Sequence, residues 1–187
     1  MKKAAVFLAP GFEEIEALTV VDVLRRAGVS CETVRVPGVD ETSGVSNVVI
    51  GAHEVPVVTD RLISENLPDY DLIVFPGGLP GATNLRDNEL VIERVQTYAA
   101  DPDKKIAAIC AAPMVFAKAG VTRGHRLTSY PGFEDLFADA LYLEEAVVVD
   151  GNMITSRGPA TALPFAYALA EALGCPVTKL KEAMLYQ

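Results

Sequence analysis

The chain has 187 residues, with 16 lysines and arginines against 25 aspartates and glutamates, and half of it is hydrophobic. The length fits one domain over residues 1–187, because domains commonly run to about 100–200 residues. A net charge of −9 argues against nucleic acid as a main partner, since neutralising phosphates requires a basic surface. The apolar fraction is too high for a disordered chain.

The first residues predict a buried strand rather than a signal peptide. The apolar run covers only residues 4–9, which is shorter than the ~7–15 residues of a signal peptide's apolar region. Pro10 and Gly11 follow at once, and two glutamates come soon after them. No run approaches the ~20 apolar residues of a membrane span, so we expect no membrane association.

The three cysteines are Cys31, Cys110 and Cys175, and they lie far apart in the sequence. An odd number at these spacings is neither a disulfide framework nor a CxxC metal site. We therefore expect reduced thiols and a cytoplasmic protein.

Short apolar runs alternate with longer amphipathic ones, and glycine or proline separates them. Strands are predicted at 4–9, 31–36, 47–50, 72–75, 106–109, 146–149 and 153–156. The first, fourth and fifth are apolar throughout, which is typical of parallel strands covered on both faces. The turn at 150–152 predicts a hairpin between the last two strands. The segment 37–46 is expected to be a surface loop before a hairpin or edge strand.

Helices are predicted at 14–27, 90–100, 113–119, 160–173 and 177–185. In the first helix, Ile15, Leu18, Val21 and Leu24 recur at helical spacing. Alternating strands and helices predict an α/β sandwich with a mostly parallel sheet and right-handed crossovers.

In such sheets, sites form beyond the carboxyl ends of the strands. The segment after the fifth strand holds Cys110 between small residues and ahead of Pro113, which resembles a nucleophile elbow. A cysteine at a helix N-terminus is expected to have a lowered pKa. The alternative is a buried, inert cysteine, and packing is the better interpretation for Cys31 and Cys175.

Two other strand-end segments would meet Cys110 if the strands are adjacent. After the first strand, Glu13 and Glu14 are interpreted as solvated acids of a helical first turn, whereas Glu16 could point inward to Cys110. A desolvated carboxyl there would have a raised pKa and donate a hydrogen bond to a thiolate. After the fourth strand, Gly77 and Gly78 could hold an oxyanion on backbone N–H groups or form only a turn.

The two histidines, His53 and His125, are not placed near a predicted catalytic segment. Because no acidic cluster is expected beside either of them, we expect no metal site. No phosphate-binding or dinucleotide motif follows the glycines, so no cofactor is expected.

Together, the motifs LAPGFEEIEA, VDVLRRAG, DLIVFPGGLPGATNL, IAAICAAP and ITSRGPAT resemble the ThiJ/PfpI superfamily, in the branch of the human Parkinson's-disease-associated deglycase and its bacterial relatives. The resemblance covers essentially the whole chain. It implies a flavodoxin-like three-layer α/β sandwich, a homodimer, and a reactive Cys110 that is easily oxidised and hydrogen-bonded by a protonated Glu16.

The resemblance also implies further site residues. Gly78 and Ala111 match the backbone donors of the oxyanion pocket, and Arg157 and Pro159 belong to a turn near the site. Arg26 matches an arginine near the dimer-side pocket.

The chain departs from the family pattern at two positions. Tyr130 takes the place of a histidine that many relatives carry, and a phenol with an unperturbed pKa of about 10 is a poor base. This argues against peptidase activity. Ser46 replaces a family arginine, which argues against an anion site there.

The leading hypothesis is a cofactor-independent enzyme of carbonyl stress, acting on methylglyoxal, glyoxal or early glycation adducts through Cys110 and Glu16. The alternative is a non-enzymatic oxidative-stress sensor or redox-regulated chaperone that uses oxidation of Cys110. A third hypothesis, a thiamine-pathway enzyme, lacks support because the sequence shows no phosphate-binding loop.

Overall fold

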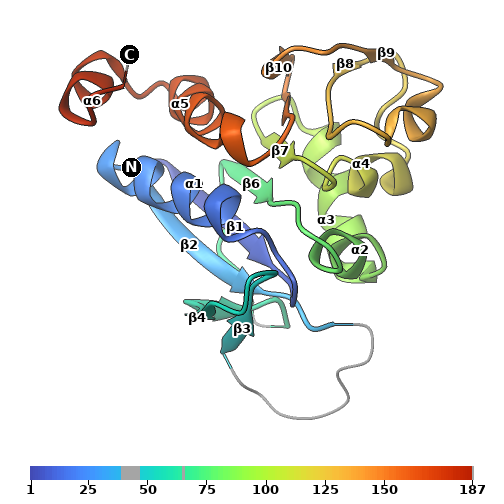
Figure 1. Ribbon diagram of the computed structural model, residues 1–187, viewed down its shortest axis with the longest axis horizontal. Helices are drawn as coiled ribbons and strands as arrows, with labels where there is room; N and C mark the ends of the chain where they lie inside the picture. The colour runs from blue at the N-terminus through green and yellow to red at the C-terminus, as the bar shows by residue number, and fades with distance from the viewer. Residues whose placement is uncertain (39–46, 65, 187) are drawn as a thin grey trace.

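The computed structural model describes residues 1–38, 47–64 and 66–186, and its centre is a seven-stranded, mostly parallel sheet (Figure 1). The strands, in spatial order, are β10 (Val147–Asp150), β11 (Met153–Ser156), β7 (Lys105–Ile109), β6 (Leu72–Phe75), β1 (Lys3–Leu8), β2 (Ser30–Arg35) and β5 (Arg61–Leu62). Among the described strands of this sheet, only the edge pair β10–β11 is antiparallel, as the turn at 150–152 predicted.

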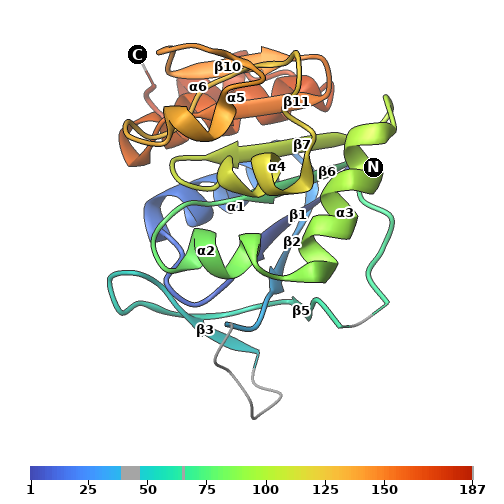
Figure 2. The same ribbon diagram turned by 90° about the vertical axis from the view of Figure 1, so that its right-hand side faces the viewer.

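Helices cover both faces of this sheet (Figure 2). They are α1 (Glu14–Arg26), α2 (Gly81–Arg86), α3 (Glu89–Ala100), α4 (Met114–Ala119), α5 (Ala162–Ala172) and α6 (Thr178–Ala183). Neighbouring β1 residues such as Val6 and Phe7 enter two separate cores, one under α1 and α5 and the other under α3 and α4. This alternation confirms the three-layer sandwich and explains why β1, β6 and β7 are apolar throughout.

Several short elements were not predicted. They are the strands β4 (Pro56–Val58), β5, β8 (Arg126–Leu127) and β9 (Leu141–Tyr142), the helix α2, and the 3-10 turns η1 (Glu134–Phe137) and η2 (Pro159–Thr161). Elements of two to six residues are too short to show a periodic pattern. The strand predicted at 47–50 is β3 (Val48–Ile50), which forms a hairpin with β4 outside the main sheet.

The predicted loop at 37–46 lies mostly outside the described residues, and Ser46 with it. The first helix buries only half of the apolar stripe that its spacing suggested, at Val21 and Leu24. Ile15 is 57% exposed and Leu18 is 37% exposed, whereas Glu16, Val20 and Val23 are fully buried. Within the described ranges, no helix has the length and apolarity needed to cross a membrane.

Candidate active site

The carboxyl ends of β7, β6 and β1 lie side by side in the sheet, because these strands are neighbours in that order. The segments that follow them carry Cys110, Gly77–Gly78 and Glu16. The juxtaposition expected from the sequence is therefore present in the structure.

Cys110 occupies a strand-to-helix turn with left-handed backbone geometry, φ +64°. A side chain other than glycine is strained in this region, typically by about 1–3 kcal/mol. The strained turn is held on both sides. The Cys110 N–H donates to the Ser156 carbonyl at 3.0 Å, and the Cys110 carbonyl accepts from the Tyr130 N–H at 2.8 Å. Such a turn exposes the thiol above the sheet, as in a nucleophile elbow.

Glu16 lies in the first turn of α1 and is fully buried. Its Oε2 accepts a hydrogen bond from the Gly77 N–H at 2.7 Å, while Oε1 is buried without a hydrogen-bond partner among the described residues. Burial raises the pKa of Glu16 to about 7, against the opposing effect of the bonds from Gly77 and Cys110. The carboxyl can therefore hold a proton near neutral pH, as predicted from the sequence.

The glycine turn leaves no room for a side chain at position 77. A Cβ added there would lie 2.6 Å from the Cys110 Cβ and 2.8 Å from the Glu16 Oε2. Gly78 has φ +83° and packs on the backbone of residues 11–13, where a Cβ would also clash. These two glycines bring backbone N–H groups up to the thiol and the carboxyl together.

The expected lowering of the Cys110 pKa by a helix N-terminus is wrong. Burial raises the pKa of the thiol to about 12, helped by the charge on Glu16, whereas the N–H groups of Gly78 and Ala111 lower it. The following helix, α4, has only six residues, and a short helix has a weak dipole. The Glu16 carboxylate contributes to the raised pKa of Cys110 through its charge and its hydrogen bond. The thiol and the carboxyl therefore form one coupled pair, in which a proton on Glu16 favours the thiolate.

Tyr130, Arg157 and Pro159 lie on segments that meet the Cys110 turn, because the Tyr130 N–H donates to the Cys110 carbonyl and residues 157–159 follow Ser156, which accepts from the Cys110 N–H. A Cβ on Gly158, which lies between Arg157 and Pro159, would be 3.4 Å from the Tyr130 ring. The Arg157 guanidinium is mostly buried and lies 3.5 Å from the Glu144 carboxylate. Tyr130 is 48% exposed, so its ring borders the site rather than filling the core.

Arg26 is not part of this group within the chain. It lies at the last turn of α1 and pairs with Asp22 at 2.7 Å. Glu16 is in the first turn, roughly 15 Å away at ~1.5 Å per helical residue. The expectation that Arg26 lies near a dimer-side pocket involves a second copy of the chain, so it stays a prediction. Cys31 is buried, which raises its pKa to about 12, in keeping with a packing role.

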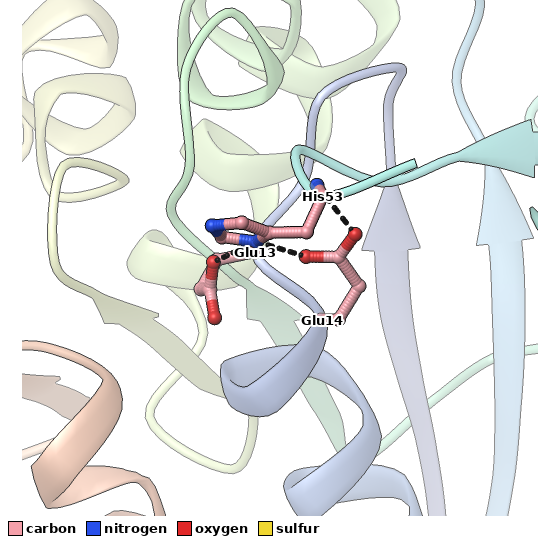
Figure 3. A group of neighbouring side chains, drawn as sticks. All are labelled: Glu13, Glu14 and His53. Carbon is pink, nitrogen blue, oxygen red and sulfur yellow. Dashed lines mark hydrogen bonds and ion pairs between the residues drawn. The ribbon is translucent and has the colours of Figure 1, made fainter. Parts of the chain in front are cut away.

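Glu13, Glu14 and His53 form a cluster that was not predicted from the sequence (Figure 3). Glu13 and Glu14 are only 6% and 7% exposed instead of solvated. The ligand-type atoms of the three side chains lie within 4.8 Å of one another. The expectation that no acidic cluster lies beside either histidine is therefore wrong for His53. His125 lies 2.9 Å from the single carboxylate of Asp150.

A family model described as "DJ-1/PfpI family" matches residues 2–172. The chain belongs to the DJ-1/PfpI family. It is 41% identical over 175 residues to Protein dj-1beta of Drosophila melanogaster, covering 92% of this chain and 89% of that protein. It is also 38% identical to Deglycase PYRAB04690 of Pyrococcus abyssi over 115 residues, or 60% of this chain and 68% of the relative.

Solved DJ-1 structures share the complete fold. The crystal structure of Drosophila DJ-1beta superposes with a TM-score of 0.91 at 37% identity, covering 100% of this chain and 98% of that one. A Toxoplasma gondii DJ-1 described as oxidized gives a TM-score of 0.90 at 36% identity, covering 100% and 99% of the two chains. These comparisons confirm the flavodoxin-like fold and the family resemblance that the sequence motifs predicted.

Proposed function

We propose that this DJ-1/PfpI protein is a cysteine-dependent, cofactor-independent enzyme of carbonyl stress. Its substrates would be small dicarbonyls such as methylglyoxal and glyoxal, or early glycation adducts. The observation that carries the proposal is the left-handed Cys110 turn, which meets a buried Glu16 that can hold a proton near neutral pH. The name deglycase borne by the Pyrococcus relative supports the same chemistry.

The first step forms a C–S bond. The Cys110 thiolate attacks the aldehyde carbon of methylglyoxal, and the carbonyl electron pair moves to oxygen. The N–H groups of Gly78 and Ala111, which lower the pKa of the Cys110 thiol, would stabilise the developing oxyanion. Glu16 then gives its proton to this oxygen, which yields a hemithioacetal and a carboxylate.

The second step moves a hydrogen between neighbouring carbons. The Glu16 carboxylate removes the C–H proton beside sulfur, and an enediolate forms with its charge on the former ketone oxygen. Glu16 returns this proton to the adjacent carbon, and the hydroxyl proton of the carbon beside sulfur moves to the neighbouring oxygen, which gives a lactoyl thioester on Cys110. Water hydrolyses the thioester, releases lactate and restores the thiol. One carbon is oxidised while its neighbour is reduced, so no external oxidant or reductant is needed.

Incubation of the protein with methylglyoxal, with lactate followed by NMR, tests the proposal. We expect lactate to form catalytically and at the same rate with a chelator present. Methylglyoxal consumption with no lactate above the heat-denatured control would contradict it.

A second candidate is a redox sensor or redox-regulated chaperone that works by oxidation of Cys110. Two observations favour it: the thiol is only partly buried, and the Toxoplasma DJ-1 was solved in an oxidized form. Peroxide titration with intact-protein mass separates the candidates. Oxidation confined to Cys110 in a protein that converts no dicarbonyl would favour the sensor.

We further propose that the protein acts as a homodimer in the cytoplasm. Exposed apolar side chains occur near the start of α1, at Ile15 and Leu18, and at the end of β3, at Ile50, whose carbonyl accepts from the Gly11 N–H. Exposed apolar side chains of this kind are suited to contact with a second copy of the chain. Light scattering is expected to give a dimer for the wild type and a monomer for Ile15→Glu. Free thiols at all three cysteines fit a reducing compartment.

A further inference from the structure

His53 is anchored to the segment that leads into the active-site helix. The Gly11 N–H donates to the Ile50 carbonyl at 2.8 Å, and the Ala52 N–H donates to the Phe12 carbonyl at 2.8 Å. The loop after β3 is thus bound to the turn between β1 and α1. His53 therefore has a fixed position relative to the first turn of α1, which carries Glu16.

The imidazole of His53 lies between two carboxylates (Figure 3). Its Nδ1 is 2.8 Å from the Glu14 Oε2 and 3.3 Å from the Glu13 Oε2. The His53 backbone N–H also donates to the Glu14 Oε1 at 2.7 Å. A Cβ on Gly51 would overlap the Glu14 carboxyl, so the loop fits around this carboxylate only with glycine there.

In the described part of the chain, the positive charge that balances the carboxylates of Glu13 and Glu14 comes from His53 when its imidazole is protonated. Glu13 and Glu14 are buried, and among the described residues their ion pairs are with His53 and with no lysine or arginine. Buried carboxylates are stable only with such compensation. The charge of this cluster therefore depends on whether the His53 imidazole is protonated.

The cluster connects to the reacting groups through the glycine turn. The Glu13 N–H donates to the Gly77 carbonyl at 2.9 Å, and the Gly77 N–H donates to Glu16 at 2.7 Å. The negative charge of Glu13 also contributes to raising the pKa of Glu16. A change of charge at His53 is therefore felt by the Glu16–Cys110 pair.

We propose that His53 is a positioning residue for the Cys110 site and that its protonation sets the pH at which the Cys110 thiol becomes reactive. This inference deepens the proposed function, but its test does not require turnover. A protonated His53 cancels one negative charge near the pair, so the pair releases its first proton at a lower pH. A neutral His53 leaves that charge uncompensated, and the thiol reacts only at higher pH.

The groups that face the imidazole determine how far its positive charge persists as the pH rises. Glu13, the N-cap of α1, and Glu14, its first residue, face the imidazole, and Glu54 is the neighbouring charged residue on its own loop. The glycine turn at 77–78 brings no titratable side chain. All three neighbours are acidic, and the bond to Glu14 and the charges of both clustered acids raise the pKa of His53. The imidazolium therefore persists to a higher pH than in a free histidine.

The test compares His53→Gln, which removes the charge, with His53→Lys, which makes it permanent. The rate of Cys110 alkylation by iodoacetamide is followed against pH by intact mass and peptide mapping. We expect His53→Gln to react roughly two- to fivefold more slowly than His53→Lys at neutral pH, as one nearby charge would produce. The wild type should follow the lysine variant at low pH and the glutamine variant at high pH.

His125→Gln is the matched control. The Nδ1 of His125 also pairs with a carboxylate, that of Asp150. Asp150 lies opposite the first residue of β11, whereas Cys110 bonds to Ser156, the last residue of β11. His125 is therefore at the other end of this strand from the reactive site. This control should alkylate like the wild type. Equal profiles for His53→Gln and His53→Lys would overturn the proposal. A wild-type profile altered by a chelator would also overturn it, because it would assign the cluster to a bound metal ion. Lactate assays of the same variants then report on the proposed function separately.

Discussion

Glu16→Gln is expected to retain a reactive Cys110 and to lose turnover. Glutamine can still accept the Gly77 N–H bond through its amide oxygen, as the carboxyl does now at 2.7 Å, and its amide group can donate to sulfur. It removes the charge that helps to raise the pKa of Cys110, so alkylation at neutral pH should be as fast as in the wild type or faster. It has no proton to transfer, and lactate formation should fall by roughly 10²–10⁴-fold.

Both rates are measured on the same preparation of Glu16→Gln, with the exposed Glu182→Gln on α6 as a control. The control should match the wild type in both assays. Lactate formation within twofold of the wild type in Glu16→Gln would contradict the proton-transfer role. Loss of both alkylation and lactate formation would mean that the substitution disrupts the structure of the site and not only its proton transfer.

Gly77→Ala is expected to damage the site by steric overlap. The added methyl carbon would fall 2.6 Å from the Cys110 Cβ and 3.0 Å from its sulfur. Because the turn is packed on buried backbone, it can relieve this overlap only by moving away from Glu16. We expect a loss of about 1–3 kcal/mol in the free energy of unfolding and a fall in lactate formation of roughly 100-fold from misplaced groups.

Gly174→Ala distinguishes a general loss of stability from steric damage to the active site. Gly174 follows α5 with φ +82° and open space around it, so alanine there adds backbone strain of roughly 1 kcal/mol without touching the site. Urea unfolding and lactate assays of both variants provide the comparison. If Gly174→Ala lost activity as strongly as Gly77→Ala, general destabilisation would explain both, and the steric argument would fail.

The sequence predicted the arrangement of Cys110, Glu16 and Gly77 because each follows an apolar strand, and carboxyl ends of neighbouring parallel strands share one edge. The buried strands also predicted the fold, since continuous apolar runs require helices on both faces. Position in the sequence could not give the Cys110 pKa. That value depends on desolvation and on the charge of Glu16, which are properties of the packed site.

The cluster of Glu13, Glu14 and His53 was missed for a related reason. Acids in a first helical turn are usually solvated, and His53 is 39 residues from Glu14 in sequence. Only the packing of the loop after β3 against the start of α1 brings them together. The presence of Gly51 beside His53 was the one local signal, because glycine permits a close approach of another group.

Lactate formation from methylglyoxal by Cys110→Ser, beside Cys175→Ser, tests the central claim most directly. Both cysteines are unpaired and partly buried, but only Cys110 lies in the strained turn beside Glu16. A serine hydroxyl is a far weaker nucleophile than a thiolate, so we predict that Cys110→Ser loses lactate formation by ~10³-fold or more. Cys175→Ser should keep the wild-type rate. Equal rates of lactate formation in Cys110→Ser and the wild type would contradict the mechanism.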